Sequence, residues 1–145
     1  MGLLIDTSVL IALERSGGAL SDRLGKLADE FPTIAAITAS ELLHGVHRAN
    51  NAMRRQKRER FVETILDLVV VLPFDLATAR IHSRLWADLQ AQGQMIGGHD
   101  QLIAATALRH DLTLLTYNER EFRRVDGLRL SPQPPPPPAD PDPRS

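Results

Sequence analysis

The chain has 145 residues, a formal net charge of −1, 43% apolar residues, 24% charged residues and no cysteine. That length predicts one domain with a substantial core, and the near-neutral charge argues against a molecule whose whole surface binds polyanions. The absence of cysteine excludes disulfides and thiolate metal ligands, and the absence of a basic leader or of an apolar run near ~20 residues leads us to expect a cytoplasmic protein outside any membrane.

Apolar patterns predict alternating strands and helices along most of the chain. In chain order we expect a strand at 3–6, helices at 8–15 and 20–31, a strand at 33–37, helices at 38–49 and 53–69, a strand at 69–73, helices at 75–92 and 99–110, a strand at 113–117 and a last short strand at 128–130. Thr7 or Ser8 would cap the first helix, and Pro32 would end the second. In the helix at 75–92, Trp86 is expected in the core.

This order of elements predicts an α/β fold. Strands separated by helical crossovers run parallel, and right-handed crossovers cover both faces of the sheet with helices. We therefore expect a three-layer α/β/α sandwich over residues 1–130, with a central, mainly parallel sheet of four or five strands. Residues 131–145 hold eight of the ten prolines and cannot bury a core, so we expect an extended or disordered tail there.

Polar side chains follow the predicted strands at the edge where sites form in such folds. Asp6 ends the first strand, Glu41 lies in the first turn after TIAAI, Asp100 opens a helix and Asn118 follows TLLTY. Each acid alone has a structural explanation. Asp6 would be a helix cap, Glu41 would complete a capping box, and Asp100 would complement a helix dipole.

Taken together, the three acids point to a cation. Two carboxylates ~5 Å apart at an effective dielectric constant of ~20 repel by roughly 3 kcal/mol, so three mutual pairs cost about 10 kcal/mol, comparable to the stability of a domain. Either protons are retained at a raised pKa or a cation binds. Oxygen ligands favour Mg²⁺ or Mn²⁺ over Zn²⁺. Of the histidines, His44 and His47 are assigned to the basic surface, and His99 beside Asp100 could tune the site.

Four segments resemble, in order and in amino-acid sequence, the four motifs of PIN-domain ribonucleases, and more narrowly those of the VapC-type toxins of bacterial toxin–antitoxin modules. They are LLIDTSVLIALE, ITASELLHGV, GGHDQLIAATAL and LLTYNEREFRRVDGLRL. The resemblance spans about residues 3–130. It implies a Mg²⁺- or Mn²⁺-dependent endoribonuclease that forms a homodimer, cuts structured RNA such as tRNA, and is silenced by a cognate antitoxin.

The resemblance also assigns residues by position. Asp6, Glu41 and Asp100 match the family's three acidic residues and are the implied metal ligands. Asn118 matches a fourth position that is Asp in many members and Asn in others, and Thr116 matches a hydroxyl residue two positions earlier. A neutral amide at position 118 removes one anionic ligand and so weakens the case for a second metal.

A catalytic mechanism follows as a hypothesis. Asp6 and Asp100 hold the metal directly or through water, while Glu41 completes its shell or orients the attacking water. Attack by water leaves a 5′-phosphate and a 3′-hydroxyl. Six of the 17 Lys and Arg residues lie between positions 48 and 60. Such a run is usually a solvated helix face, but beside a nuclease site it becomes an RNA-backbone contact, carried by Arg48, Arg54, Arg55, Lys57 and Arg58.

Three alternatives remain to be compared with this interpretation. A phospho-acceptor receiver domain needs a lysine near the last strand, and the only lysines are Lys26 and Lys57. A haloacid-dehalogenase-type phosphatase needs an Asp two positions after the first one, where Ser8 stands. A non-catalytic PIN module that binds RNA or protein is disfavoured by the three acids.

Overall fold

The computed structural model describes residues 2–16 and 30–132. In chain order the elements are β1 (Leu3–Ile5), α1 (Thr7–Arg15), β2 (Pro32–Ala35), α3 (Ala36–His47), α4 (Ala52–Leu68), β3 (Val70–Leu72), α5 (Leu76–Ala91), α6 (Gly98–Arg109), β4 (Thr113–Leu115) and α7 (Glu119–Phe122). The helix predicted at 20–31 lies almost entirely outside these ranges, as does most of the tail predicted at 131–145. Except for the strand expected at 128–130, the other predicted elements are present within a few residues of their expected ends.

The four strands form one sheet in the order β3-β2-β1-β4, and every pair is parallel. The strand expected at 128–130 is reduced to a single parallel bridge between Leu130 and Leu114 at the β4 edge. Parallel strands joined by helical crossovers are therefore confirmed. The carboxyl ends of β1, β2 and β4 lie at the same edge of the sheet, with β1 in the middle.

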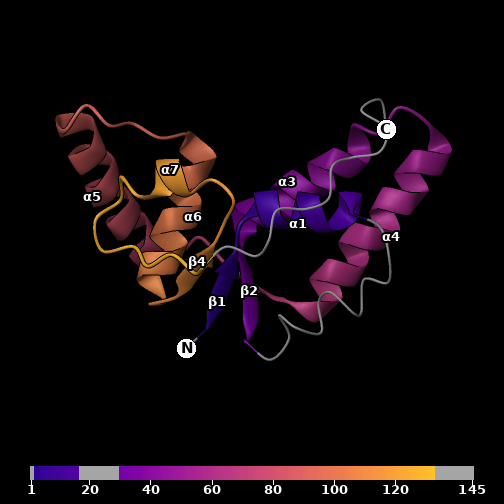
Figure 1. Ribbon diagram of the computed structural model, residues 1–145, viewed down its shortest axis with the longest axis horizontal. Coiled ribbons are helices and arrows are strands. Elements are labelled where there is room, and N and C mark those ends of the chain that lie inside the picture. Colours follow the sequence, from indigo (N-terminus) through magenta and orange to yellow (C-terminus); the bar gives the residue numbers. More distant parts are fainter. Residues whose placement is uncertain (1, 17–29, 133–145) are drawn as a thin grey trace.

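Side chains on the two faces of the sheet enter two separate cores. Leu3 and Ile5 of β1 pack with α1, α3 and α4, whereas Leu4 between them packs with α5 and α6. This alternation is the two-residue period of a strand that is buried on both faces. Figure 1 shows the result, with α5, α6 and α7 on one side of the strands and α1, α3 and α4 on the other. The predicted three-layer α/β/α sandwich is confirmed.

Three local predictions are wrong. Helix α1 begins at Thr7, so Asp6 and not Thr7 or Ser8 holds its N-cap position, and its side chain makes no capping hydrogen bond. Helix α3 begins at Ala36, directly after β2, so Glu41 lies in the helix interior and cannot complete a capping box. Trp86 is 49% exposed and stacks on His82 with ring centroids 5.7 Å apart instead of entering the core.

The corrected helix starts matter for the site, because neither Asp6 nor Glu41 is engaged in capping a helix. Their carboxylates remain available for other partners. Among the helices of the described ranges, none has the length and apolarity needed to cross a lipid bilayer.

Candidate active site

The sheet brings the ends of β1 and β4 together around Asp6. Asp6 directly follows β1, and its N–H donates to the carbonyl of Leu115 at the end of β4 over 2.9 Å. The Asp6 side chain is only 4% exposed. A carboxylate removed from water in this way needs strong hydrogen-bond donors or a cation to remain charged.

Two hydroxyl groups supply those donors, and both reach the same oxygen. Thr116 Oγ1 donates to Asp6 Oδ2 over 2.7 Å, and Ser8 Oγ donates to the same atom over 2.8 Å. Each hydroxyl oxygen also accepts a main-chain N–H, from Asn118 to Thr116 over 2.9 Å and from Tyr117 to Ser8 over 3.2 Å. The accepted N–H bonds orient the hydroxyl hydrogens towards Asp6. The two hydroxyl groups therefore fix Oδ2 of Asp6, and among the described residues they leave Oδ1 for another ligand.

Glu41 reaches the same region from α3. Thr7 Oγ1 donates to Glu41 Oε1 over 3.0 Å and lies 3.2 Å from Thr38 Oγ1, which ties the start of α1 to α3. The other carboxylate oxygen of Glu41 lies 3.7 Å from Nδ1 of His99, in the first turn of α6. Glu41 is therefore held at the junction of α1, α3 and α6.

Asp100 completes the group of acids from the first turn of α6. Its Oδ2 accepts a hydrogen bond from Nδ2 of Asn118 over 3.2 Å. The pKa of Asp100 is raised to about 6, first by burial and then by the negative charges of Asp6, Glu41 and Glu121, while His99 acts in the opposite direction. The three predicted acids therefore lie near enough to one another to interact electrostatically.

Glu121 is a fourth acid that the motif assignment did not include. It lies in α7 and forms an ion pair with Arg124 over 3.6 Å. Its influence on the pKa of Asp100 places its charge within range of the same crevice. The sequence signal was only its position shortly after Asn118, at the start of the helix that follows β4.

The acids fit a hydrated divalent ion better than a closed cage. Within residues 2–16 and 30–132, no three His, Asp or Glu side chains are grouped closely enough to enclose a metal ion among them. Mg²⁺ usually keeps several water ligands and is held by one or two carboxylates. Among the described residues, Oδ1 of Asp6 accepts no hydrogen bond. This oxygen, the carboxylate of Asp100 and the negative charge around it match that requirement.

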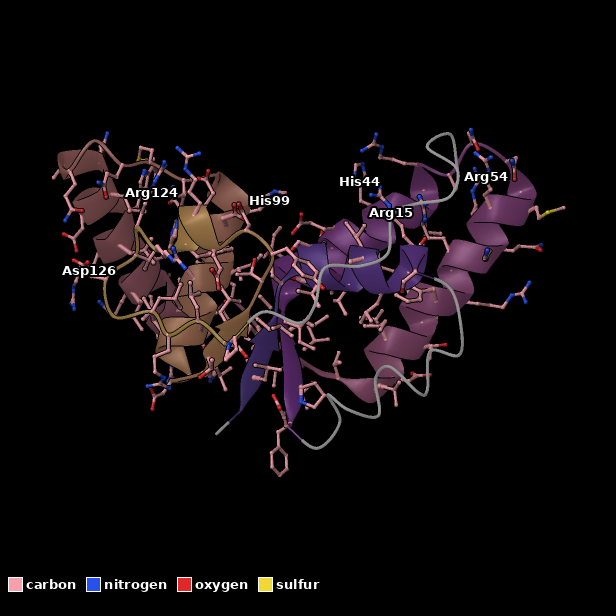
Figure 2. The ribbon with its side chains drawn as sticks, in the orientation of Figure 1. Arg15, His44, Arg54, His99, Arg124 and Asp126 are labelled. Carbon is pink, nitrogen blue, oxygen red and sulfur yellow. The ribbon has the colours of Figure 1, made fainter. Side chains whose placement is uncertain are left out.

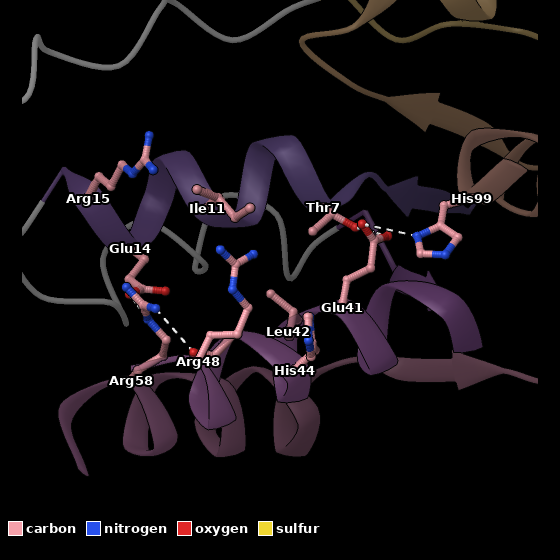
Figure 3. A pocket seen from close by; sticks show the side chains of 11 residues that line it. Thr7, Ile11, Glu14, Arg15, Glu41, Leu42, His44, Arg48, Arg58 and His99 are labelled. Carbon is pink, nitrogen blue, oxygen red and sulfur yellow. Dashed lines mark hydrogen bonds and ion pairs between the residues drawn. The ribbon is translucent and has the colours of Figure 1, made fainter. Parts of the chain in front are cut away.

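A pocket of about 450 Å³ runs between α1 and α3, from Glu41 to a group of arginines, while Asp6 and Asp100 are not among the residues that line it. Figure 3 shows Thr7, Glu41 and His99 at one end, and Glu14, Arg15, Arg48 and Arg58 at the other. Ile11 and Leu42 line the wall between the two ends. Glu41 and the start of the basic segment therefore line the same pocket.

The five basic residues considered for RNA contact are not equivalent. Arg48 and Arg58 line the pocket, whereas Arg54, Arg55 and Lys57 do not. Arg58 donates to Glu14 Oε1 over 3.1 Å and to the carbonyl of Gly45 over 3.1 Å, so it joins α4 to α1 and α3. Arg54 bonds Asn50 and Arg55 bonds the carbonyl of Ala49. Figure 2 shows Arg54 on α4, at a distance from His99.

Comparison with known proteins assigns the family. The family described as PIN domain matches residues 3–128. The chain is 42% identical over 128 residues to Ribonuclease VapC1 of Rickettsia felis, covering 88% of this chain and 93% of that protein. It is 30% identical over 126 residues to the tRNA(fMet)-specific endonuclease VapC of Shigella flexneri, a match that covers 87% of this chain and 93% of that protein.

A solved structure agrees with both sequence matches. The fold superimposes with a TM-score of 0.80 on a chain of the crystal structure of VapBC2 from Rickettsia felis bound to a DNA fragment from their promoter, at 25% identity, covering 90% of this chain and 98% of that one. The match extends over the sheet and both helical layers. The chain therefore belongs to the PIN-domain family, and within it to the VapC-type proteins.

Proposed function

We propose that this protein is a divalent-metal-dependent endoribonuclease that acts as the toxin of a toxin–antitoxin pair. The observation that carries the proposal is the position of Asp100, half-buried and within electrostatic reach of Asp6 and Glu41: burial first, and then these negative charges, raise its pKa to about 6. Carboxylates in that arrangement are stabilised by a bound cation. The family relationship supports RNA cleavage as the use of that cation.

Asp6 and Asp100 are the residues that would hold Mg²⁺ or Mn²⁺, directly or through water. A bound ion of this type supplies a water of lowered pKa and a positive charge opposite the charge that develops on the phosphate. Thr116 and Ser8 keep Asp6 in one orientation through its Oδ2. Asn118 would likewise hold the orientation of Asp100 by donating from Nδ2 to Asp100 Oδ2.

Glu41 is placed to orient the attacking water or to complete the ligand shell through water. Its Oε1 is held by Thr7, and its Oε2 faces His99. In the reaction, the water oxygen forms a bond to phosphorus and the bond between phosphorus and the 3′ oxygen breaks. The proton of the water passes to a carboxylate oxygen of the site, and the 3′ oxygen takes up a proton, leaving a 5′-phosphate and a 3′-hydroxyl.

The relatives also suggest the substrate and the partners. The Shigella flexneri relative is named for specificity towards tRNA(fMet), and the solved neighbour from Rickettsia felis is a VapBC assembly. We propose a structured RNA of the tRNA class as substrate, a cognate antitoxin as inhibitor, and a homodimer that acts in the cytoplasm.

The experiment is a cleavage assay on purified tRNA with Mg²⁺, with Mn²⁺ and with EDTA. We expect cleavage only with a metal, ends that carry a 5′-phosphate, and loss of cleavage in Asp6→Asn and Asp100→Asn. Asp126→Asn makes the same change of charge at an exposed position, which Figure 2 shows well apart from His99, the neighbour of Asp100 in the sequence, and it should retain activity. Cleavage that survives in EDTA or in both site variants would refute the proposal, and RNA binding without cleavage would favour a non-catalytic PIN module.

A further inference from the structure

The pocket between α1 and α3 has Glu41 at one end and arginines at the other. The arginines can bind phosphate directly, and the acidic end would do so through the proposed divalent ion. We infer that Arg15 and Arg48 form a second phosphate-binding subsite, which holds the RNA backbone a few nucleotides away from the bond that is cut. The inference deepens the proposed function and rests on it. It adds Arg15, which lies outside the basic segment at 48–60, and it separates Arg48 from its neighbours in that segment.

The arginines that line the pocket differ in whether their side chains are already bonded to other residues. Arg58 is occupied by Glu14 and by the carbonyl of Gly45. Arg15 and Arg48 are both exposed and line the pocket. Neither makes a side-chain hydrogen bond or an ion pair to another residue in the part of the chain that the structure describes. Two guanidinium groups are therefore available at one end of the pocket, and Glu14 beside them is already paired.

The position of these arginines also has a structural explanation, which the test must separate from binding. Arg15 is the last residue of α1 and Arg48 is the C-cap of α3. Cations at helix C-termini are stabilised by the helix dipole, typically by ~0.3–1 kcal/mol. That effect accounts for an arginine at either helix end, but it does not require both guanidinium groups to line the same pocket.

The separation of the two ends fits a polynucleotide. Glu41 and Arg48 lie two turns apart on α3, about 10 Å along its axis, and Thr7 and Arg15 lie at opposite ends of α1, about 12 Å apart. At ~3.4 Å per nucleotide of a stacked strand, this distance corresponds to roughly three nucleotides. The acids with their ion would hold the cleaved phosphate while the arginines hold a later or earlier one.

The chemistry of the pocket favours RNA over a protein partner. A divalent ion held beside the Glu41 end would bind phosphate, as do the guanidinium groups at the other end, and phosphates repeated along one molecule are the property of a nucleic acid. Ile11 between the two ends offers apolar surface to a sugar or a base, while Leu42 beside it is buried. Part of Ile11, 39% of its surface, is exposed for such a contact.

The test is a series of single-stranded RNA oligonucleotides from two to eight nucleotides, cleaved by the wild type, Arg15→Gln, Arg48→Gln and the double variant. We expect kcat/KM of the wild type to rise with length. The double variant should lose about tenfold or more on the longer RNAs, mainly through KM, and much less on the dinucleotide. Arg84→Gln, an exposed position on α5, is the matched control for loss of one positive charge.

Binding of the eight-nucleotide RNA to these variants in an Asp6→Asn background, measured by fluorescence anisotropy over a salt series, provides a readout without cleavage. Each lost phosphate contact should reduce the slope of log K against log salt by about 0.7. An equal loss on short and long RNAs, a loss as large in Arg84→Gln, or unchanged binding in the double variant would overturn the subsite, and unchanged binding would leave the helix dipole as the explanation for both arginines.

The two proposals fail in different ways. If the wild type binds RNA with the predicted dependence on length and on both arginines but does not cleave it, the subsite stands and the proposed activity falls. If the wild type cleaves RNA with a metal but shows no dependence on Arg15 and Arg48, the activity stands and the subsite falls. If it does not bind RNA at all, both are wrong.

Discussion

Thr116 Oγ1 donates a 2.7 Å hydrogen bond to Oδ2 of Asp6, across 110 positions of the sequence. The bond joins the end of β4 to the end of β1, which are neighbours in the sheet. Together with the bond from Ser8, it uses one oxygen of Asp6 and leaves the other for the metal. Asp6 is therefore expected to bind a metal through a single oxygen.

Loss of either hydroxyl group should weaken metal binding without unfolding the protein. Outer-shell partners of metal ligands typically change metal affinity or activity by about 10–100-fold, so we expect an effect of that size in Thr116→Val and Ser8→Ala. Thr116→Ser keeps the donor and should retain most of the affinity. Mn²⁺ titration calorimetry measures the affinity, and equal affinities for the valine and serine variants would contradict this role.

The raised pKa of Asp100 predicts how the stability of the metal-free protein depends on pH. Between about pH 4 and 6, the folded chain keeps a proton on Asp100 that the unfolded chain, with a pKa of 3.8, has released. Stability therefore falls as pH rises through this range and levels above pH 6. Because Asp100 is only half-buried, we expect a contribution of about 1 kcal/mol after solvent screening.

Urea unfolding in EDTA, compared between the wild type and Asp100→Asn, isolates that contribution from the other acids. The stability of the wild type should fall relative to the variant from pH 4 to pH 6. With Mg²⁺ present, the stabilisation of the wild type by the metal should grow as pH rises through 6, because binding requires the ionised carboxylate. Parallel pH profiles for the two proteins in EDTA would show that the acids do not interact as described.

The same substitution should affect different properties at Arg58 and at Arg48: mainly stability at Arg58 and mainly RNA binding at Arg48. Arg58→Gln removes the bonds to Glu14 and to the carbonyl of Gly45 and should lower stability by about 1 kcal/mol, since the ion pair is partly exposed. Arg48→Gln loses only the interaction with the helix dipole, so it should lower stability less than Arg58→Gln, by about 0.3 kcal/mol, and should weaken RNA binding. Thermal unfolding and RNA anisotropy on both variants provide the measurement. A stability loss in Arg48→Gln as large as in Arg58→Gln would remove the distinction between the two residues.

The fold could be predicted because it depends on local patterns. Short apolar runs separated by helical segments require a parallel sheet covered on both faces, and the acids that follow those runs are then expected at one sheet edge. Asp6 is expected at a strand end for this reason, whereas Thr116 is assigned only by the resemblance to the PIN-domain family. The predicted start of α3 is wrong because TASE has the pattern of a capping box. In the structure the helix begins at Ala36, directly after β2 and without a loop.

The contacts that distinguish the site residues could not be predicted. Arg48 and Arg58 belong to one run of positive charge, and only the packing of α4 against α1 and α3 shows which of them is already paired. The direction of the Ser8 hydroxyl depends on an N–H of Tyr117, more than a hundred positions away. Such relationships are properties of tertiary structure and leave no pattern in the sequence.

The central claim, that Asp6 and Asp100 hold one divalent ion, is tested most directly by anomalous diffraction at the manganese edge from crystals grown with Mn²⁺. The account predicts a single strong peak within ligand distance of Asp6 Oδ1 and the Asp100 carboxylate, with Glu41 reached directly or through water. A peak elsewhere, or no peak at a Mn²⁺ concentration that supports RNA cleavage, would contradict it.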